Sequence, residues 1–107
     1  MRAFASLRRR SDFARLRNRG RRLATPSLTI FEAPPAARDG KALVGITVSK
    51  AVGGAVVRNR LRRRISAIIQ DVFVAGKHQA RILIVARPKA AELAFGELRA
   101  ELTRALQ

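Results

Sequence analysis

Alternating hydrophobic and polar positions predict strands in the middle of the chain. The alternation runs through residues 28–31 and again through residues 43–49, and a period of two is that of a strand with one buried face. The loop of residues 33–41, which contains Pro-Pro and Asp-Gly, separates these two runs. A third run, residues 81–86, is apolar at consecutive positions and is followed by Pro88, which is typical of an interior strand covered on both faces.

Helical spacing predicts three helices around these strands. The first, Ser11–Arg19, is short and polar, with Ser11 as its expected cap and Gly20 after its end. The second runs from about Ala55 to Ala75 and the third from about Ala91 to Leu106. Each of the two longer helices carries one apolar stripe that must pack on the sheet: Val57, Leu61, Ile65, Ile68 and Val72 on the second, and Phe95, Leu98, Leu102 and Leu106 on the third.

The order of these elements is α, β, β, α, β, α, and one additional strand would fit the pattern. We expect an α/β fold of the α+β type, a two-layer sandwich in which the helices pack on one sheet. A chain of 107 residues supports one hydrophobic core, so we expect a single domain over residues 1–107. The pattern assigns no helix or strand to residues 1–6. It leaves open whether these residues are ordered when no partner is bound.

The charge of the chain narrows its partners. Lys and Arg number 23 against 7 Asp and Glu, for a net charge of +16, and 19 of the basic residues are arginine. A compact protein of this charge repels itself unless a polyanion lies beside it, and guanidinium groups bind phosphate oxygens bidentately. The sequence contains no cysteine, which excludes disulfides, thiolate zinc sites and cysteine nucleophiles. Nucleic acid is therefore the expected partner.

The basic residues lie in two blocks. Residues 1–25 hold nine arginines against Asp12, and residues 50–64 hold Lys50 and five arginines with no acidic residue. A merely solubilising surface would intersperse the two signs of charge, so this layout indicates a footprint for an anion. Apolar stretches such as Ile82–Ala86 are too short to span a bilayer, and no apolar run of secretory length follows the basic N-terminus. We expect a cytoplasmic protein without a membrane partner.

The second basic block lies at the entry to the second predicted helix. If the apolar stripe faces the core, a rotation of about 100° per residue places the arginines of residues 58–64 around the exposed sides of the first two turns. Gly53 and Gly54 precede the helix. Glycines let a ligand approach the backbone closely, and the free N–H groups at a helix start attract phosphate. A tight turn after the strand would equally explain the two glycines, although Lys50 before them favours an anion site.

These residues resemble a known family, the protein subunit of bacterial ribonuclease P. Residues 49–63, Ser-Lys-Ala-Val-Gly-Gly-Ala-Val-Val-Arg-Asn-Arg-Leu-Arg-Arg, are similar to its signature, whose core is an Arg-Asn-Arg triplet that enters a basic helix after a strand and a glycine. Residues 7–13, followed by Gly20, are similar to the first helix of the family. The resemblance covers roughly residues 7–105.

The resemblance implies a fold and two RNA contacts. The implied sheet has about four strands, and the second helix lies in a left-handed crossover, which is the rare hand for such connections. In the family the basic helix contacts the catalytic RNA, and a cleft between the sheet and the first helix binds the single-stranded 5′ leader of precursor tRNA. The matching positions are Lys50, Arg58, Asn59, Arg60, Arg62 and Arg63 for the catalytic RNA, and Phe13, Arg17 and Phe31 for the leader cleft.

Two positions depart from the family pattern. One turn after Phe13, where the family usually has a second aromatic residue, this chain has Arg17, which exchanges ring stacking for guanidinium stacking or a phosphate contact. The usual later arginine of the second helix falls at Ser66. For Phe13 and Phe31 themselves, burial in the core is the alternative to stacking on unpaired bases.

No catalytic residue and no metal site are expected in the polypeptide. Its seven acidic residues are spread over caps, loops and helix faces, and His78 stands alone. The resemblance implies that the RNA subunit holds the Mg²⁺ for leader removal, and that the protein is a non-catalytic accessory subunit of this endoribonuclease. Its implied partners are the catalytic RNA and precursor tRNA, with no DNA. A small structural RNA-binding protein of ribosomal type is the alternative function, and an autonomous nuclease is a third.

Overall fold

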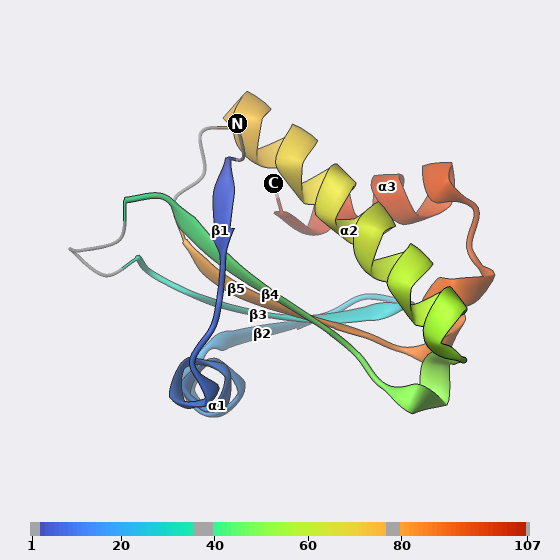
Figure 1. Cartoon of the computed structure of the whole chain (residues 1–107). Helices are drawn as coiled ribbons and strands as arrows, with labels where there is room; N and C mark the ends of the chain where they lie inside the picture. The colour runs from blue at the N-terminus through green and yellow to red at the C-terminus, as the bar shows by residue number, and fades with distance from the viewer. Residues whose placement is uncertain (1–2, 36–39, 77–79, 107) are drawn as a thin grey trace.

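The computed structural model describes residues 3–35, 40–76 and 80–106. These residues form five strands, three α-helices and two short 3-10 helices (Figure 1). In chain order the elements are β1 (Phe4–Ser6), α1 (Arg10–Arg19), β2 (Arg21–Ala24), β3 (Leu28–Ala33), β4 (Ala42–Val48), η1 (Lys50–Val52), α2 (Ala55–Gly76), β5 (Arg81–Ala86), η2 (Pro88–Glu92) and α3 (Phe95–Leu106).

The strands form one sheet in the order β1-β4-β5-β3-β2. β4 is parallel to both of its neighbours, β1 and β5, whereas β3 is antiparallel to β5 and β2 is antiparallel to β3. Figure 1 shows α2 and α3 on one face of the sheet and α1 crossing the opposite face at one end. The expected α/β sandwich is confirmed, with α1 on the other side of the sheet from the two longer helices.

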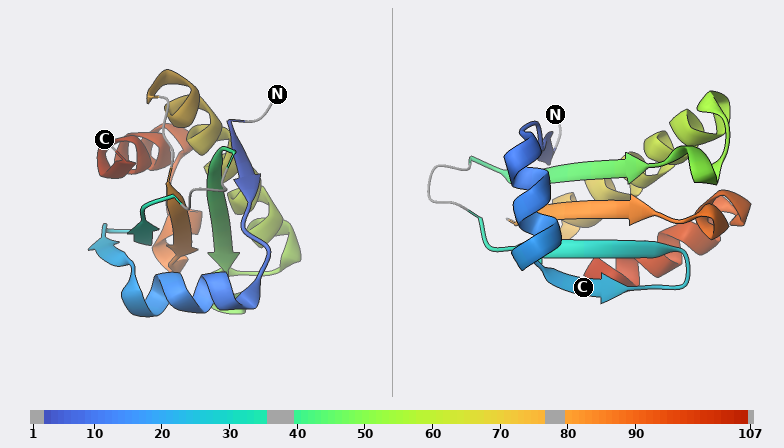
Figure 2. Two further views of the ribbon diagram at one scale, coloured as in Figure 1. Left: turned by 90° about the vertical axis from the view of Figure 1, so that its left-hand side faces the viewer. Right: turned by 90° about the horizontal axis from the view of Figure 1, so that it is seen from below.

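The connection from β4 through α2 to its parallel neighbour β5 is a left-handed crossover. In the view from below in Figure 2, α2 lies behind the sheet, β4 and β5 point to the right, and β5 lies below β4. Seen from the helix side with the strands pointing up, β5 therefore lies to the left of β4, which is the rare hand. The crossover implied by the family resemblance is thus present.

The apolar stripe of α2 forms the centre of the main core. The predicted residues Leu61, Ile65 and Ile68 are buried, and the stripe widens to include Ile69 and Phe73. Burying one such side chain stabilises a fold by about 1.5–3 kcal/mol, so this stripe fixes which side of α2 faces the sheet. The sheet residues in the same cluster include Leu28, Ile30, Val44, Val48, Ile82 and Ile84.

α3 begins at Phe95, later than the predicted start at Ala91. Pro88–Glu92 form the separate short helix η2 instead, and the N–H of Ala94 donates to Oε1 of Glu97 at 2.9 Å, which caps the start of α3. Phe95 lies in this first turn and is 38% exposed, so its predicted place in the core is wrong. The other predicted core residues of α3 are buried: Leu98, Leu102 and Leu106.

The sequence pattern does not predict β1 or β2. The sheet has five strands, whereas about four are expected from the family resemblance. β1 has only three residues and all four residues of β2 are exposed, so neither shows an alternation of hydrophobic and polar positions. β1 is held by its pairing with β4 and by the N–H of Ala3, which donates to Oε1 of Gln70 on α2 at 2.7 Å. Strand structure therefore begins at Phe4, within residues 1–6.

α1 is fixed to the sheet by one ion pair and a small second core. The helix begins at Arg10, and no side chain caps it, so Ser11 is not the cap that the sequence predicts. Asp12 in the first turn instead accepts a hydrogen bond from Arg81 of β5 at 3.2 Å, with both side chains largely buried. Leu16 packs with Leu7 and Leu83 in a cluster separate from the main core.

Phe13 of α1 lies against the backbone of β4 at Gly45. A Cβ atom placed on Gly45 would lie 2.8 Å from Cε1 of Phe13 and 3.2 Å from Cδ2 of Leu7. Both separations are shorter than carbon atoms accept without movement. Glycine at this position therefore allows α1 to approach the sheet as closely as it does.

Glu101 of α3 fastens the turn between β2 and β3. Its Oε2 accepts hydrogen bonds from the Thr25 hydroxyl at 2.6 Å, the Ser27 hydroxyl at 2.5 Å and the Ser27 N–H at 3.1 Å. Burial raises the pKa of Glu101, but the hydrogen bonds from Ser27 and Thr25 and the charge of Arg87 outweigh this, so its pKa lies below the ordinary value of 4.5. Glu101 is thus a polar anchor of the fold and not only a solvated helix residue.

We expect Glu101→Gln to lower the free energy of unfolding by about 1.5–3 kcal/mol at neutral pH, because hydrogen bonds to a charged carboxylate are lost. Since the folded pKa is depressed, this stabilisation is complete above pH 4.5 and is lost as the pH falls through the folded value. Urea unfolding at neutral and at successively lower pH measures the effect. A difference between wild type and variant that stays constant on acidification would contradict it.

We expect Gly45→Ala to lower the free energy of unfolding by about 1–3 kcal/mol, because the new methyl group must displace Phe13 or the strand. Thermal melting measures the loss. Gly96→Ala is the matched control, since a Cβ at Gly96 would meet nothing within 4 Å and alanine favours a helix. Equal melting temperatures for the two variants would show that Phe13 is not held against Gly45.

Candidate nucleic-acid interface

The junction between β4 and α2 turns at Gly53. Its φ of 158° and ψ of −171° belong to a region that only glycine adopts readily, and a Cβ there would lie 3.0 Å from Cγ1 of Val57. Gly54 is exposed and has no such demand, because a Cβ there would meet nothing within 4 Å. The tight turn therefore explains Gly53 alone. Lys50, in η1 just before it, is exposed.

The arginines of α2 lie around its exposed sides. Arg60 and Arg63 are exposed, whereas Arg58 and Arg62 are half-buried beside the apolar stripe. Nε of Arg58 is buried and has no hydrogen-bond partner among the described residues. A buried donor without a partner is unfavourable, so this side chain is stabilised by any movement that lets Nε donate a hydrogen bond.

Arg62 and Asn59 are paired with each other. Nη1 of Arg62 donates to Oδ1 of Asn59 at 2.8 Å, and Nη2 lies 3.5 Å from the carbonyl oxygen of Val48. Val48 is the last residue of β4. Arg62 therefore links the end of the sheet to the exposed face of α2.

Phe13 and Phe31 lie on the sheet face opposite to α2. Phe31 of β3 pairs in register with Leu83 of β5, and both rings pack partly buried against the cluster that contains Leu16. Arg17 is exposed in the last turn of α1. Neither ring is wholly in the core or wholly free, so each has one packed side and a part that remains accessible.

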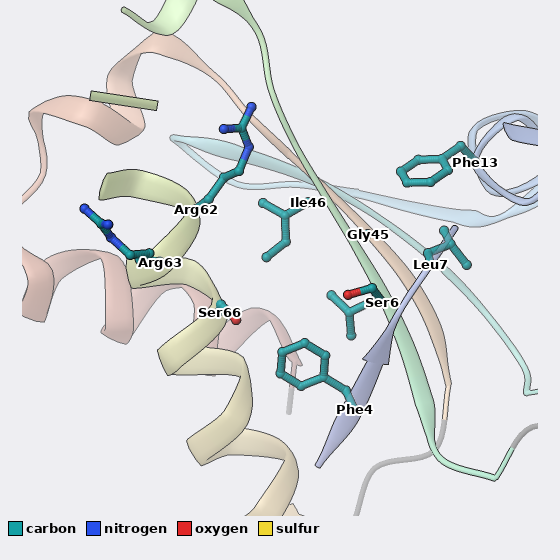
Figure 3. Close-up of a pocket in the computed structure, with 10 residues that line it drawn as sticks. Phe4, Ser6, Leu7, Phe13, Gly45, Ile46, Arg62, Arg63 and Ser66 are labelled. Carbon is teal, nitrogen blue, oxygen red and sulfur yellow. The ribbon is translucent and has the colours of Figure 1, made fainter. Parts of the chain in front are cut away.

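A pocket of about 350 Å³ lies between α1, the edge of β4 and α2 (Figure 3). It exists because β1 pairs with β4 only as far as Val44, which leaves the edge of β4 beyond that residue open. Figure 3 shows Phe13 at the α1 end of the pocket and Arg62 and Ser66 on α2 at the other. The full lining is Phe4, Ser6, Leu7, Phe13, Val44, Gly45, Ile46, Arg62, Arg63 and Ser66.

The pocket brings together residues from both basic blocks of the sequence, residues 1–25 and 50–64. Phe13 comes from the first block, and Arg62 and Arg63 come from the second. Phe4 and Ser6 could not be found from the sequence, because their place depends on the pairing of β1, which no pattern indicates. The predicted site residues that do not line the pocket are Arg17, Phe31, Lys50, Arg58, Asn59 and Arg60.

Acidic side chains connect elements of the fold through ion pairs. Asp12 pairs with Arg81, and Asp71 of α2 pairs with Arg99 of α3 at 2.8 Å. Within residues 3–35, 40–76 and 80–106, no three His, Asp or Glu side chains lie close enough to hold a metal ion. His78 lies outside the described residues. In the same ranges, no helix has the length and apolar character needed to cross a membrane.

Two solved structures with the same fold are RNase P proteins. The RNase P protein of Staphylococcus aureus superimposes with a TM-score of 0.78 at 24% sequence identity, covering 94% of this chain and 91% of that chain. The RNase P protein of Thermotoga maritima gives a TM-score of 0.74 at 24% identity, covering 94% of each chain. At this level of identity, the likeness establishes the fold.

Sequence comparison leads to the same family. Residues 1–107 match the profile of the family described as Ribonuclease P. The ribonuclease P protein component of Acidothermus cellulolyticus is 39% identical over 94% of this chain and 83% of its own length, and that of Erythrobacter litoralis is 36% identical over 96% and 84%. The chain therefore belongs to the family of ribonuclease P protein components, the accessory subunits of an endoribonuclease that acts in tRNA processing.

Proposed function

We propose that the protein binds the catalytic RNA of ribonuclease P through the start of α2 and the 5′ leader of precursor tRNA beneath α1. The observation that carries this proposal is the pocket at the edge of β4, which Phe13 lines at one end and Arg62 and Arg63 line at the other. Binding of a single strand beside structured RNA needs cations for the phosphates and rings for the unpaired bases. The pocket offers both at one edge of the sheet.

The start of α2 is the proposed contact with the catalytic RNA. Its arginines can bind phosphate oxygens through two parallel hydrogen bonds, and the free N–H groups at the helix start add positive potential. Gly54 is exposed and leaves room for a phosphate at that end. No acidic residue occurs between positions 50 and 64, and the proposed contact residues are Lys50, Arg58, Asn59, Arg60, Arg62 and Arg63.

Phe13, Phe31 and Arg17 are the proposed contacts with the leader. The rim atoms Cε1 and Cζ of Phe13 lie against Gly45, and the ring is only partly buried, so a base can stack on the part that stays accessible. Stacking on an aromatic ring contributes about 1–3 kcal/mol per base and tolerates any base. Arg17, exposed at the end of α1, would add a cation beside the rings.

The proposed role of the protein is electrostatic and positional. The reaction is hydrolysis of the phosphodiester bond between the leader and the mature tRNA, and Mg²⁺ held by the RNA subunit would supply its chemistry. The cations of α1 and α2 would neutralise crowded phosphates where the two RNAs meet, which lowers the magnesium concentration that assembly needs. Because both partners are transcripts, we propose that the protein acts in the cytoplasm.

Reconstitution at low magnesium tests this function. Wild-type protein is expected to stimulate leader removal by a ribonuclease P RNA, and the Arg58→Ala/Arg60→Ala double variant is expected to assemble more weakly. With about six phosphate contacts, the logarithm of affinity for the RNA should fall with the logarithm of salt concentration by roughly 5.4 for wild type and roughly 3.6 for the double variant, at about 0.9 per contact.

Arg104→Ala is the matched control, because it removes an arginine that is exposed in the last turn of α3. Its salt slope should equal that of wild type, and all three proteins should melt at similar temperatures. Absence of stimulation by the wild-type protein would favour a structural RNA-binding protein of ribosomal type. Cleavage by the protein without the RNA subunit would indicate an autonomous nuclease.

We expect Phe31→Leu to reduce the preference of the complex for precursor tRNA over mature tRNA by roughly five- to tenfold, since one stacking platform is lost. Leucine keeps an apolar side chain packed against the cluster that contains Leu16, so the melting temperature should change little. Binding of the two tRNAs to the reconstituted complex measures the preference. A variant that melts lower yet discriminates normally would assign Phe31 to the core alone.

A further inference from the structure

The pairing of Arg62 with Asn59 gives these two residues different roles on the RNA-binding surface of α2. We propose that Arg62 is a positioning residue, which fixes the side-chain amide of Asn59 so that Asn59 presents its N–H donors to RNA. This inference rests on the proposed binding of the catalytic RNA by α2.

The geometry anchors the Asn59 amide through Arg62 to the sheet. Nη1 of Arg62 donates to Oδ1 of Asn59 at 2.8 Å, while Nη2 is directed to the carbonyl oxygen of Val48 at 3.5 Å. Arg62 is half-buried and Asn59 is exposed. One guanidinium group thus spans the last residue of β4 and the outer face of α2, so its orientation is constrained at both ends.

This contact decides what Asn59 can offer to a ligand. An asparagine amide has one carbonyl oxygen that accepts hydrogen bonds and one NH₂ group with two donors. Because Oδ1 accepts from Arg62 through one of its two lone pairs, the orientation of the amide is fixed, and the two N–H donors of Nδ2 remain for an outside acceptor. Phosphate oxygens are acceptors only, and the 2′-hydroxyl and several base atoms accept as well. An amide held in this orientation therefore matches RNA.

The contact also explains why a guanidinium group suits position 62. Its planar fork carries several N–H donors in fixed directions, so it can donate to Oδ1 of Asn59 and to the carbonyl oxygen of Val48 at the same time. A lysine would keep the charge, but its single ammonium group on a flexible stem could not hold both acceptors in this geometry. Arg62→Lys therefore separates positioning from charge.

A double-mutant cycle on binding to a ribonuclease P RNA at fixed salt concentration tests the inference. We expect Asn59→Ala and Arg62→Ala each to weaken binding by roughly five- to tenfold. The double variant should bind no more than about twofold more weakly than Arg62→Ala, because the two residues act as one unit. Arg62→Lys, which keeps the charge but cannot hold Asn59, should still bind severalfold more weakly than wild type. Additive effects, or wild-type affinity for Arg62→Lys, would overturn the inference.

Asn59→Asp adds an independent readout. The carboxylate can still accept from Arg62, so the melting temperature should not fall, but it replaces the outward donors with an acceptor and a negative charge. Binding should therefore weaken more than in Asn59→Ala. In the free protein, the side-chain amide resonances of Asn59 should shift in Arg62→Ala. Unshifted resonances would count against a fixed amide.

A second cycle separates this inference from the proposed function. Arg60 is exposed and no hydrogen bond joins it to Asn59 among the described residues, so Arg60→Ala and Asn59→Ala should be additive. If Arg60→Ala weakens binding while the Arg62 and Asn59 cycle is additive, RNA binding stands and the positioning role fails. If none of these variants changes RNA affinity, the proposed function itself fails.

Discussion

Burial of one apolar stripe of α2 against the sheet decides where the arginines of that helix point. Leu61, Ile65 and Ile68 are fully enclosed, and no rotation of the helix could expose the arginines differently without bringing these side chains into water. Arg58 and Arg62 therefore border the core, and Arg60 lies in solvent. The basic surface is in this sense a by-product of hydrophobic packing. The same packing places the helix in a crossover between two parallel strands, so its first turn adjoins the end of β4.

Elements with a strong hydrophobic period could be predicted, and elements without one could not. β3, β4 and β5 and the stripes of α2 and α3 follow from the sequence because their burial is regular. β1 and β2 lack that signal, since β1 has three residues and β2 is entirely exposed. Their existence depends on backbone pairing with a neighbouring strand, and backbone hydrogen bonds leave no mark on side-chain type. The handedness of the crossover came from family resemblance, because residue spacing is the same for either hand.

The candidate site was accessible from the sequence in its chemistry but not in its geometry. The basic run before and within α2 is visible as charge, and Phe13 and Phe31 stand out in a chain with five aromatic residues. That Phe13 shares a pocket with Arg62 depends on the open edge of β4 and the close approach allowed at Gly45. The bond between Arg62 and Asn59 is likewise a property of rotamers and not of composition. Positions three apart on a helix can meet, but the sequence does not say whether they do.

The exposed edge strand β2 has a consequence for the behaviour of the protein alone. Its outer backbone groups have no neighbouring strand in the sheet order, and such an edge can template pairing with another polypeptide. Arg21 and Arg22 are its first two residues, and two copies brought edge to edge would bring these like charges into the same small region. Repulsion between these arginines therefore disfavours aggregation through the β2 edge. A protein selected to bind a polyanion obtains this protection from the same charge, and keeps it for as long as that charge is not neutralised.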